Sequence, residues 1–249
     1  MTENCNTIVR FLGCDYELFA KEADGAKICA RHEELFLQGQ REGFTPLLIC
    51  VSDTLSEAIE LACEDAEVPP TPEGAADLRR DILQKAAAVD VDNFLSARLA
   101  EYMEMHEDDE VYGTFQPCEP RACLLTIMVE NDIDEIILAK IPTTNPWELA
   151  AWVPMGGFND CPSPAEQVAV FRRWHEQYGA IPDLVSGDVW ELELRGKPPV
   201  DDEASAERLA KKHFAFCYDI VMQAASGWDN IRGLASQLKG ATTWYFWWD

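Results

Sequence analysis

Trp244-Tyr245-Phe246-Trp247-Trp248-Asp249 is the stretch of this sequence that decides the fold. Each aromatic ring buries roughly 150–250 Å² when it packs, so an unbroken aromatic run is unfavourable in water. The end of a chain normally frays and carries small or polar residues. We therefore expect Trp244–Trp248 to be a strand buried in the sheet. Because this strand is apolar on both faces, the pattern predicts that it is internal to the sheet.

Length and composition indicate a globular protein with a large core. Of the 249 residues, 47% are hydrophobic and 26% are charged, which are ordinary values for a folded protein. Strand-like and helix-like segments alternate, so we predict an α+β fold with a mixed β-sheet flanked by helices. No apolar run reaches the roughly 18–20 residues of a membrane span, and the first residues do not resemble a secretory signal. We therefore expect a cytoplasmic protein.

The formal net charge of −25 limits the expected partners. Nucleic acids and anionic membranes are disfavoured, because both are bound mainly through Lys and Arg. The charge is uneven: residues 1–149 hold 31 acidic and 11 basic side chains, and residues 150–249 hold 14 and 9. Such a surface either keeps the protein soluble or forms a face for a basic protein partner.

The change in composition along the chain suggests two parts. We predict an acidic N-terminal α/β region over residues 1–120 and a C-terminal α+β domain over residues 121–249. The alternative is one continuous compact fold, since this length suits one large domain or two small ones. The clearest break lies at Val68–Gly74, where three prolines in four residues predict an extended connection.

The cysteines indicate a reducing compartment. There are nine of them, an odd number, and no two have CxxC spacing. Most lie in apolar runs, as Cys50 does, and are expected to be small buried side chains. No disulfide framework is predicted.

Periodicity and capping residues predict the elements of the first half. Thr7–Leu12 reads as a short strand, Ala26–Gln38 as a helix and Leu47–Val51 as a buried strand. Thr54 and Glu57 have the spacing of a capping box, so a helix is expected to begin there.

Further along, Asp90 or Asp92 is expected to cap another helix. Leu124–Val129 and Glu135–Ile141 read as two strands. They would be joined by Asn131-Asp132, a turn-forming pair.

The last hundred residues carry the clearest pattern. A helix is predicted to begin after the capping residue Ser163, with Pro164 at its first position and Glu166 at its third. Gly179 is its expected end. Leu184–Val189 predicts a tight hairpin.

The second arm of this hairpin alternates apolar and charged residues. We expect the apolar residues to face the core, namely Trp190, Leu192 and Leu194. We expect the charged residues to face solvent, namely Glu191, Glu193 and Arg195. Asp201 or Asp202, and then Asp229, are expected to begin the last two helices.

Several motifs in the second half occur in a characteristic order. They are Gly156–Pro162, Trp174 with Tyr178-Gly179-Ala180, Phe214–Cys217 with Asp219, and Trp244–Asp249. Together they resemble the bacterial domain-of-unknown-function family numbered 4253, over roughly residues 135–249. Phe158 stands where that family usually has tryptophan, and Tyr218 where it usually has proline. The resemblance supports the fold prediction and implies no activity.

Gly156–Cys161 is the best candidate for a ligand-binding loop. Gly156 and Gly157 permit close backbone approach, Asn159 can orient a ligand, and Cys161 is a potential nucleophile or ligand. The loop runs into a helix N-terminus, where free N–H groups attract anions. The alternative is a tight connection in which glycine serves only the turn.

Two kinds of chemistry would use cysteine and histidine. Cys161, His175, His213 and Cys217 form a weak candidate set for zinc, since His213 and Cys217 share one helix face. Alternatively, Cys161 would be a nucleophile with His175 or His213 as its base. Because buried Cys and His are more often packing residues, no metal and no cofactor is predicted.

These observations favour a non-catalytic protein-interaction module of immunity or accessory type. Its partner would be a basic protein that contacts the acidic first part. The alternative is an enzyme or small-ligand-binding protein with its site at the Gly156–Cys161 loop.

Overall fold

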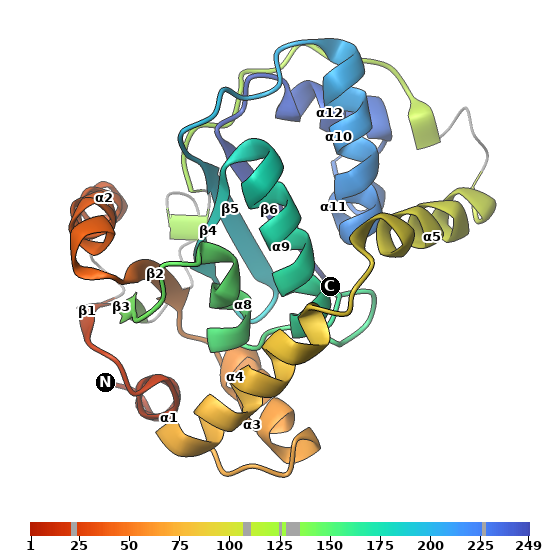
Figure 1. The fold of residues 1–249 in the computed structure, drawn as a ribbon. Helices are drawn as coiled ribbons and strands as arrows, with labels where there is room; N and C mark the ends of the chain where they lie inside the picture. Colours follow the sequence, from red (N-terminus) through yellow and green to blue (C-terminus); the bar gives the residue numbers. More distant parts are fainter. Residues whose placement is uncertain (21–23, 107–110, 125, 128–134, 226–227) are drawn as a thin grey trace.

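The computed structural model describes residues 1–20, 24–106, 111–124, 126–127, 135–225 and 228–249. It confirms the predicted α+β fold, a mixed six-stranded sheet flanked by helices (Figure 1). The strand order is β1-β3-β2-β4-β5-β6, and every neighbouring pair is antiparallel except the parallel pair β2 and β4. The strands are β1 Tyr16–Ala20, β2 Thr45–Cys50, β3 Glu135–Ile141, β4 Ala180–Val185, β5 Val189–Leu194 and β6 Thr243–Trp247.

Helices precede the first strand and separate most of the later ones along the described chain. They are α1 Glu3–Leu12, α2 Gly25–Glu42, α3 Asp53–Asp65, α4 Pro72–Ala86, α5 Val91–Glu104, the 3₁₀ turn η1 Pro146–Glu148, α8 Leu149–Trp152, α9 Pro164–Tyr178, α10 Glu203–Phe216, α11 Asp219–Met222 and α12 Ile231–Leu238. Among the described residues, none of the helices combines the length and the apolar character needed to cross a membrane.

The two faces of the sheet bury different amounts of apolar surface. Alternate residues of β2 show this: Leu47 and Ile49 join the main core, and Leu48 and Cys50 join a smaller cluster on the other face. The main core is shared with α4, α8, α9 and α10, whereas α2 covers the smaller cluster (Figure 1).

The aromatic strand β6 is buried in the sheet as predicted, but the prediction of an internal position is wrong. β6 pairs only with β5 and forms the edge of the sheet. Its alternate residues Trp244 and Phe246, with Trp248 beyond the strand, are buried in the main core, while Tyr245 and Trp247 on the other face are half-buried. Tyr245 and Trp247 pack against the smaller cluster, so both faces of β6 contact apolar residues although β5 is the only strand that pairs with it among the described residues.

An aromatic cluster fixes β6 to helices α9 and α10. Trp174 of α9 stacks on Phe246 at 5.3 Å between ring centroids and meets Trp244 edge-on at 5.6 Å. Phe216 of α10 contacts Phe246 at 5.1 Å and Trp248 at 5.5 Å. Each such pair contributes about 0.5–1.5 kcal/mol beyond the buried area.

Helix starts were predicted well where a capping residue immediately precedes the helix. The capping box of Ser163 and Glu166 is present in full, and Asp90 and Asp202 cap α5 and α10. Gly179 ends α9 in the left-handed conformation, at φ 71°.

Two predicted caps are wrong by one or two residues. Ser52 caps α3, accepting a hydrogen bond from the Leu55 N–H at 3.1 Å, so Thr54 already lies inside the helix. Asn230 caps α12 in place of the neighbouring Asp229. The break at Val68–Gly74 is also shorter than predicted, because Pro72 takes the first position of α4.

Two predicted strands do not form as expected. Thr7–Leu12 belongs to helix α1, because Cys5, Ile8 and Phe11 recur at helical spacing and bury one face. Of Leu124–Val129, residues 126–127 are helical, and residues 125 and 128–129, with the turn pair Asn131-Asp132, lie outside the described residues. The Thr126 N–H donates to the buried Glu191 carboxylate at 2.8 Å instead of to a strand.

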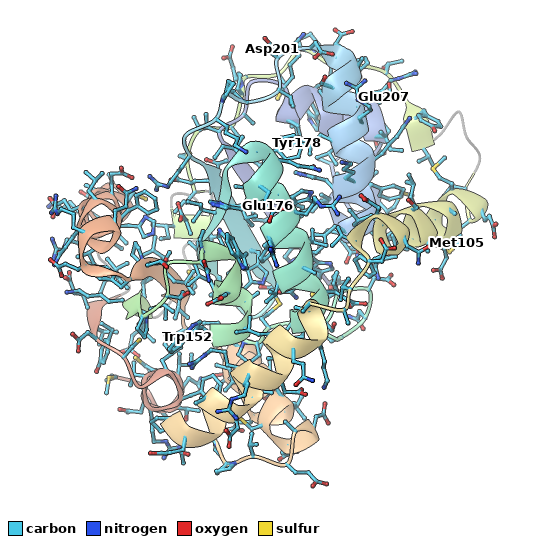
Figure 2. All side chains as sticks on the ribbon, viewed as in Figure 1. Met105, Trp152, Glu176, Tyr178, Asp201 and Glu207 are labelled. Atoms are coloured by element: carbon cyan, nitrogen blue, oxygen red, sulfur yellow. The ribbon has the colours of Figure 1, made fainter. Side chains whose placement is uncertain are left out.

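Both predicted regions contribute to the one sheet. Residues 1–120 supply β1 and β2, and residues 121–249 supply the other strands. Helix α4 lies against α9 and against α8, which carries Trp152 (Figure 2). The Arg79 guanidinium of α4 lies over the Trp152 ring, 3.0 Å from its centre. The division at residue 120 into two folding units stays a prediction.

Candidate functional site

The Gly156–Cys161 loop is a turn closed by its own backbone. The Gly157 N–H donates to the carbonyl groups of Cys161 and Pro162, both at 3.2 Å. The Cys161 N–H donates to the Phe158 carbonyl at 2.8 Å. Two of the backbone donors expected to face a ligand are therefore engaged within the loop.

A buried glutamine holds the two ends of this loop together. The Gln167 amide on α9 donates to the carbonyl groups of Met155 at 2.7 Å and Pro162 at 2.8 Å. Its oxygen accepts a hydrogen bond from the Trp190 indole at 2.8 Å. A side chain at Gly156, where φ is 125°, would collide with the Gln167 amide and the Pro162 carbonyl. Packing is thus sufficient to explain this glycine.

Asn159 lies at the exposed tip of the loop. It has a positive φ of 44°, which is uncommon for a residue other than glycine. Its side-chain amide donates to the main-chain oxygen of Asp249. This contact ties the loop to the segment that follows β6.

Cys161 is enclosed by the protein. Its side chain is in contact with the sulfur of Met155, and the residue is only 5% exposed. Burial raises the pKa of the Cys161 thiol well above its usual value, and the nearby Cys217 acts in the same direction. The environment therefore favours the protonated thiol over the thiolate that nucleophilic chemistry requires.

The two histidines of the proposed sets lie in different surroundings. His175 is half-buried, and its Nδ1 lies 3.2 Å from the Ala180 carbonyl while its ring contacts Trp147. His213 is 1% exposed and is surrounded by Trp174, Trp244 and Phe246 at 4.6–4.9 Å. Burial lowers the pKa of His213 to about 3, so the ring is neutral at physiological pH.

The four candidate zinc ligands are not brought together as a set. The Cys217 thiol donates to the Trp247 carbonyl at 3.0 Å, and neither ring nitrogen of His213 has a hydrogen-bond partner among the described residues. In the part of the chain that the structure describes, no group of three His, Cys, Asp or Glu side chains is arranged to hold a metal ion.

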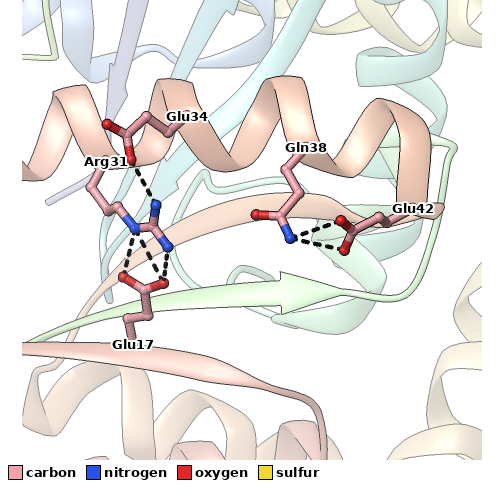
Figure 3. A network of polar contacts seen from close by, with 5 residues as sticks. All are labelled: Glu17, Arg31, Glu34, Gln38 and Glu42. Atoms are coloured by element: carbon pink, nitrogen blue, oxygen red, sulfur yellow. Dashed lines mark hydrogen bonds and ion pairs between the residues drawn. The ribbon is translucent and has the colours of Figure 1, made fainter.

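A buried ionic cluster lies elsewhere, between the sheet and α2. Arg195 pairs with Asp183 at 3.0 Å, Glu193 at 2.6 Å and Glu33 at 2.6 Å. His32 of α2 lies 3.8 Å from the Asp183 carboxylate, which is fully buried. Figure 3 shows a second network on the same helix, where Arg31 joins Glu17 of β1 to Glu34.

The cluster shifts the protonation of its members. Burial and the adjacent Asp183 carboxylate raise the pKa of Glu193 to about 7, although Arg195 opposes the shift. Burial, with Arg195 second, lowers the pKa of His32 to about 4. Coupled groups of this kind are common both at functional sites and in structural ion networks.

Sequence reasoning missed this cluster because it assigned one face of β5 to solvent. Glu191 is 0% exposed and Glu193 is half-buried, so the predicted outward orientation of these residues is wrong. The available signal was Asp183, a charged residue inside an otherwise apolar strand.

The acidic first part does present an exposed face. Glu57, Glu60 and Glu64 form one stripe of α3, and all are exposed. Leu61 lies in the same stripe and is 58% exposed. None of these three carboxylates forms an ion pair or hydrogen bond with another described residue.

Comparison with known proteins supports the resemblance seen in the motifs. The family model described as Domain of unknown function (DUF4253) matches residues 137–249. This part of the chain is similar to the DUF4253 family. The DUF4253 match contains the Gly156–Cys161 loop, α9, α10 and the aromatic strand β6. Searches of curated proteins and of solved structures find no match.

The burial of Cys161 predicts a pattern of thiol reactivity. At pH 7 a maleimide should modify the exposed Cys118 and Cys123 first and leave Cys161 and Cys217 intact until the protein unfolds. Mass spectrometry of digests measures the order, with urea-denatured protein as the control. Rapid labelling of Cys161 in the folded protein would instead support a reactive thiol.

The raised pKa of Glu193 predicts a pH-dependent stability. A carboxyl that binds its proton more tightly in the folded state stabilises that state under acidic conditions. This contribution to folding stability is lost as pH rises from about 4.5 to about 7. Glu193→Gln should therefore gain stability relative to the wild type across this window and remain at a constant difference above it. Urea unfolding at several pH values tests this. Glu101→Gln, at an exposed position of α5, is the control. If the stability of Glu193→Gln varied with pH in parallel with that of the wild type, the account would be contradicted.

Proposed function

We propose that this chain is a non-catalytic interaction protein whose α3 face binds a basic segment of a protein partner. The observation that carries the proposal is the position of Leu61, which is 58% exposed within the stripe of Glu57, Glu60 and Glu64. An amphipathic basic helix is complementary to such a stripe, because it offers cations around an apolar residue.

The net charge of the chain supports the same proposal. With a net charge of −25, the protein attracts a basic partner over a distance set by ionic strength. Among the residues that the structure describes, none forms an ion pair with the three carboxylates of the stripe. They can therefore pair with incoming cations without first breaking an internal salt bridge.

An immunity or accessory role in the cytoplasm is the setting that we propose for this binding. Such a protein acts by occupying a surface of its partner and needs no reactive group. The protonated, buried thiol of Cys161 and the neutral, buried ring of His213 are consistent with that role.

A second proposal places a small-ligand or enzymatic site at the Gly156–Cys161 loop. One observation favours it: Gly157 and Asn159 are exposed, and Asn159 holds a positive φ, a conformation often found at functional sites. If a ligand is found to bind the chain, a loss of its affinity in the Asn159→Ala variant would support this alternative.

The interaction proposal is tested with an amphipathic peptide of Lys and Leu. Its affinity for the full chain is measured by calorimetry. Glu57→Gln/Glu60→Gln/Glu64→Gln should weaken binding by about tenfold at low salt, because three uncompensated charges are lost from the face. Leu61→Ser should weaken it without changing the charge.

The matched control removes the same charge elsewhere. Glu101→Gln/Glu104→Gln/Asp201→Asn changes exposed residues outside α3, and Asp201 lies at the opposite end of the molecule (Figures 1 and 2). This triple variant should retain affinity within about twofold. Equal losses in the two triple variants, or binding unaffected by salt, would contradict a specific α3 face.

A further inference from the structure

A hollow lies where helix α5 meets the C-terminal end of α10, away from α3 (Figure 1). Leu95 and Leu99 line this α5–α10 hollow from α5, one helical turn apart. The side chains that line it from α10 recur at helical spacing and form one stripe of that helix, namely Arg208, Lys211, Lys212 and Ala215. One stripe of each helix therefore faces the hollow.

The hollow is apolar where the two helices meet. Ala215, at the C-terminal end of the α10 stripe, is buried, and its carbonyl accepts a hydrogen bond from Nε of Arg98 at 2.7 Å. This bond holds the part of α5 that carries the buried Leu95 and the half-buried Leu99 against α10. Arg208 lies seven residues before Ala215, and so about 10 Å away from this junction along the axis of α10.

The cations of the α10 stripe are available to an incoming group. Arg208 is exposed and donates to the Ser205 hydroxyl of its own helix at 2.7 Å. Neither Arg208 nor Lys212 forms an ion pair with another described residue. Lys211 pairs with Glu207 at 3.0 Å. An anion that reaches Arg208 and Lys212 therefore breaks no ion pair among the described residues.

The sign of this local charge is opposite to that of the whole chain, which carries a net charge of −25. Asp92 also lines the hollow, but Arg173 already pairs with its carboxylate at 2.8 Å. Repulsion of an anion by the rest of the chain is screened beyond about 8 Å at physiological ionic strength, whereas direct ion pairs persist. Charge complementarity therefore favours an acidic ligand at this place.

The size and spacing of the hollow indicate which acidic ligand fits. Its volume is about 260 Å³, below the roughly 300–1,000 Å³ of small-molecule pockets, so it suits individual side chains of a larger partner. Arg208 and Lys212 are four residues apart and so lie about one turn apart on α10. An α-helix with acidic residues four apart offers carboxylates at the same interval, whereas a single carboxylate would reach only one turn of the stripe.

We propose that the α5–α10 hollow binds an acidic amphipathic helix of a partner protein. Carboxylates one turn apart on that helix pair with Arg208 and Lys212. An apolar side chain on the same face enters the junction beside Leu95 and Leu99. Insertion of an amphipathic helix into a groove is a common mode of peptide recognition. This site is separate from the α3 face, so neither proposal depends on the other.

The test is a calorimetric titration of the full chain with a helical peptide of Glu, Leu and Ala, in salt of about 0.15 M. The Glu and Leu residues of the peptide occupy adjacent stripes. Arg208→Gln/Lys212→Gln should weaken binding by about tenfold, because two ion pairs are lost. Replacement of the Leu residues of the peptide by Ser should weaken binding by at least about tenfold, since the apolar contact is lost.

The matched control removes two cations elsewhere. Lys27→Gln/Arg41→Gln changes exposed residues of α2, which lies away from α10 (Figure 1). This variant should retain affinity within about twofold. Glu57→Gln/Glu60→Gln/Glu64→Gln should not weaken binding of the acidic peptide, and this result separates the hollow from the α3 face.

Three results with the peptide would overturn the proposal. They are the absence of binding at millimolar concentration, equal losses in the two double variants, and equal affinity for the Leu and Ser peptides. Circular dichroism checks that each variant is folded. If Arg208→Gln/Lys212→Gln does not fold, Lys212→Gln alone should weaken binding by about threefold, and unchanged affinity would also overturn the proposal.

Two other occupants have their own signatures. Binding of octanoate without binding of the peptide would assign the hollow to a small carboxylate. Self-association of the chain that is lost in Arg208→Gln/Lys212→Gln would assign it to a second copy. Either result would overturn the proposal of a partner helix.

Discussion

The packing of one face of β6 against α9 and α10 is the interaction on which the rest of the structure depends. Trp244, Phe246 and Trp248 meet Trp174 and Phe216 in a continuous aromatic cluster. Removing a single large ring from such a core costs about 3–5 kcal/mol, a large part of the stability of a typical domain. The cluster also encloses His213, whose neutral ring has no hydrogen-bond partner in the part of the chain that the structure describes.

The same strand gives the molecule its most distinctive surface. Because successive side chains of a strand point to opposite faces of the sheet, the residues that alternate with the core aromatics lie on the other face, where Tyr245 and Trp247 line a hollow. The loop at Gly156–Cys161, in contrast, serves to join α8 to α9 and to hold the end of β6 through Asn159. One alternating aromatic sequence therefore supplies both a core and a hollow.

Much of this fold could be predicted from local sequence, because caps and turns act through neighbouring residues. Ser163 with Glu166, Asp202 and the β4–β5 hairpin were found on that basis. The edge position of β6 and the burial of Glu191 were not, since both depend on residues distant in sequence that cover one face of the sheet. For the same reason Asp183, Glu193 and Arg195 could not be recognised as one cluster, and the α5–α10 hollow could not be foreseen.

Native-state hydrogen exchange of β6 tests the central claim most directly. If the aromatic cluster secures the fold, the amides of β6 that pair with β5 should exchange only through global unfolding, although the strand lies at an edge. Their protection should then equal that of amides in the central strand β2 and fall with it on addition of denaturant. Exchange of β6 at the fast rate of a frayed terminus, while β2 remains protected, would contradict this account.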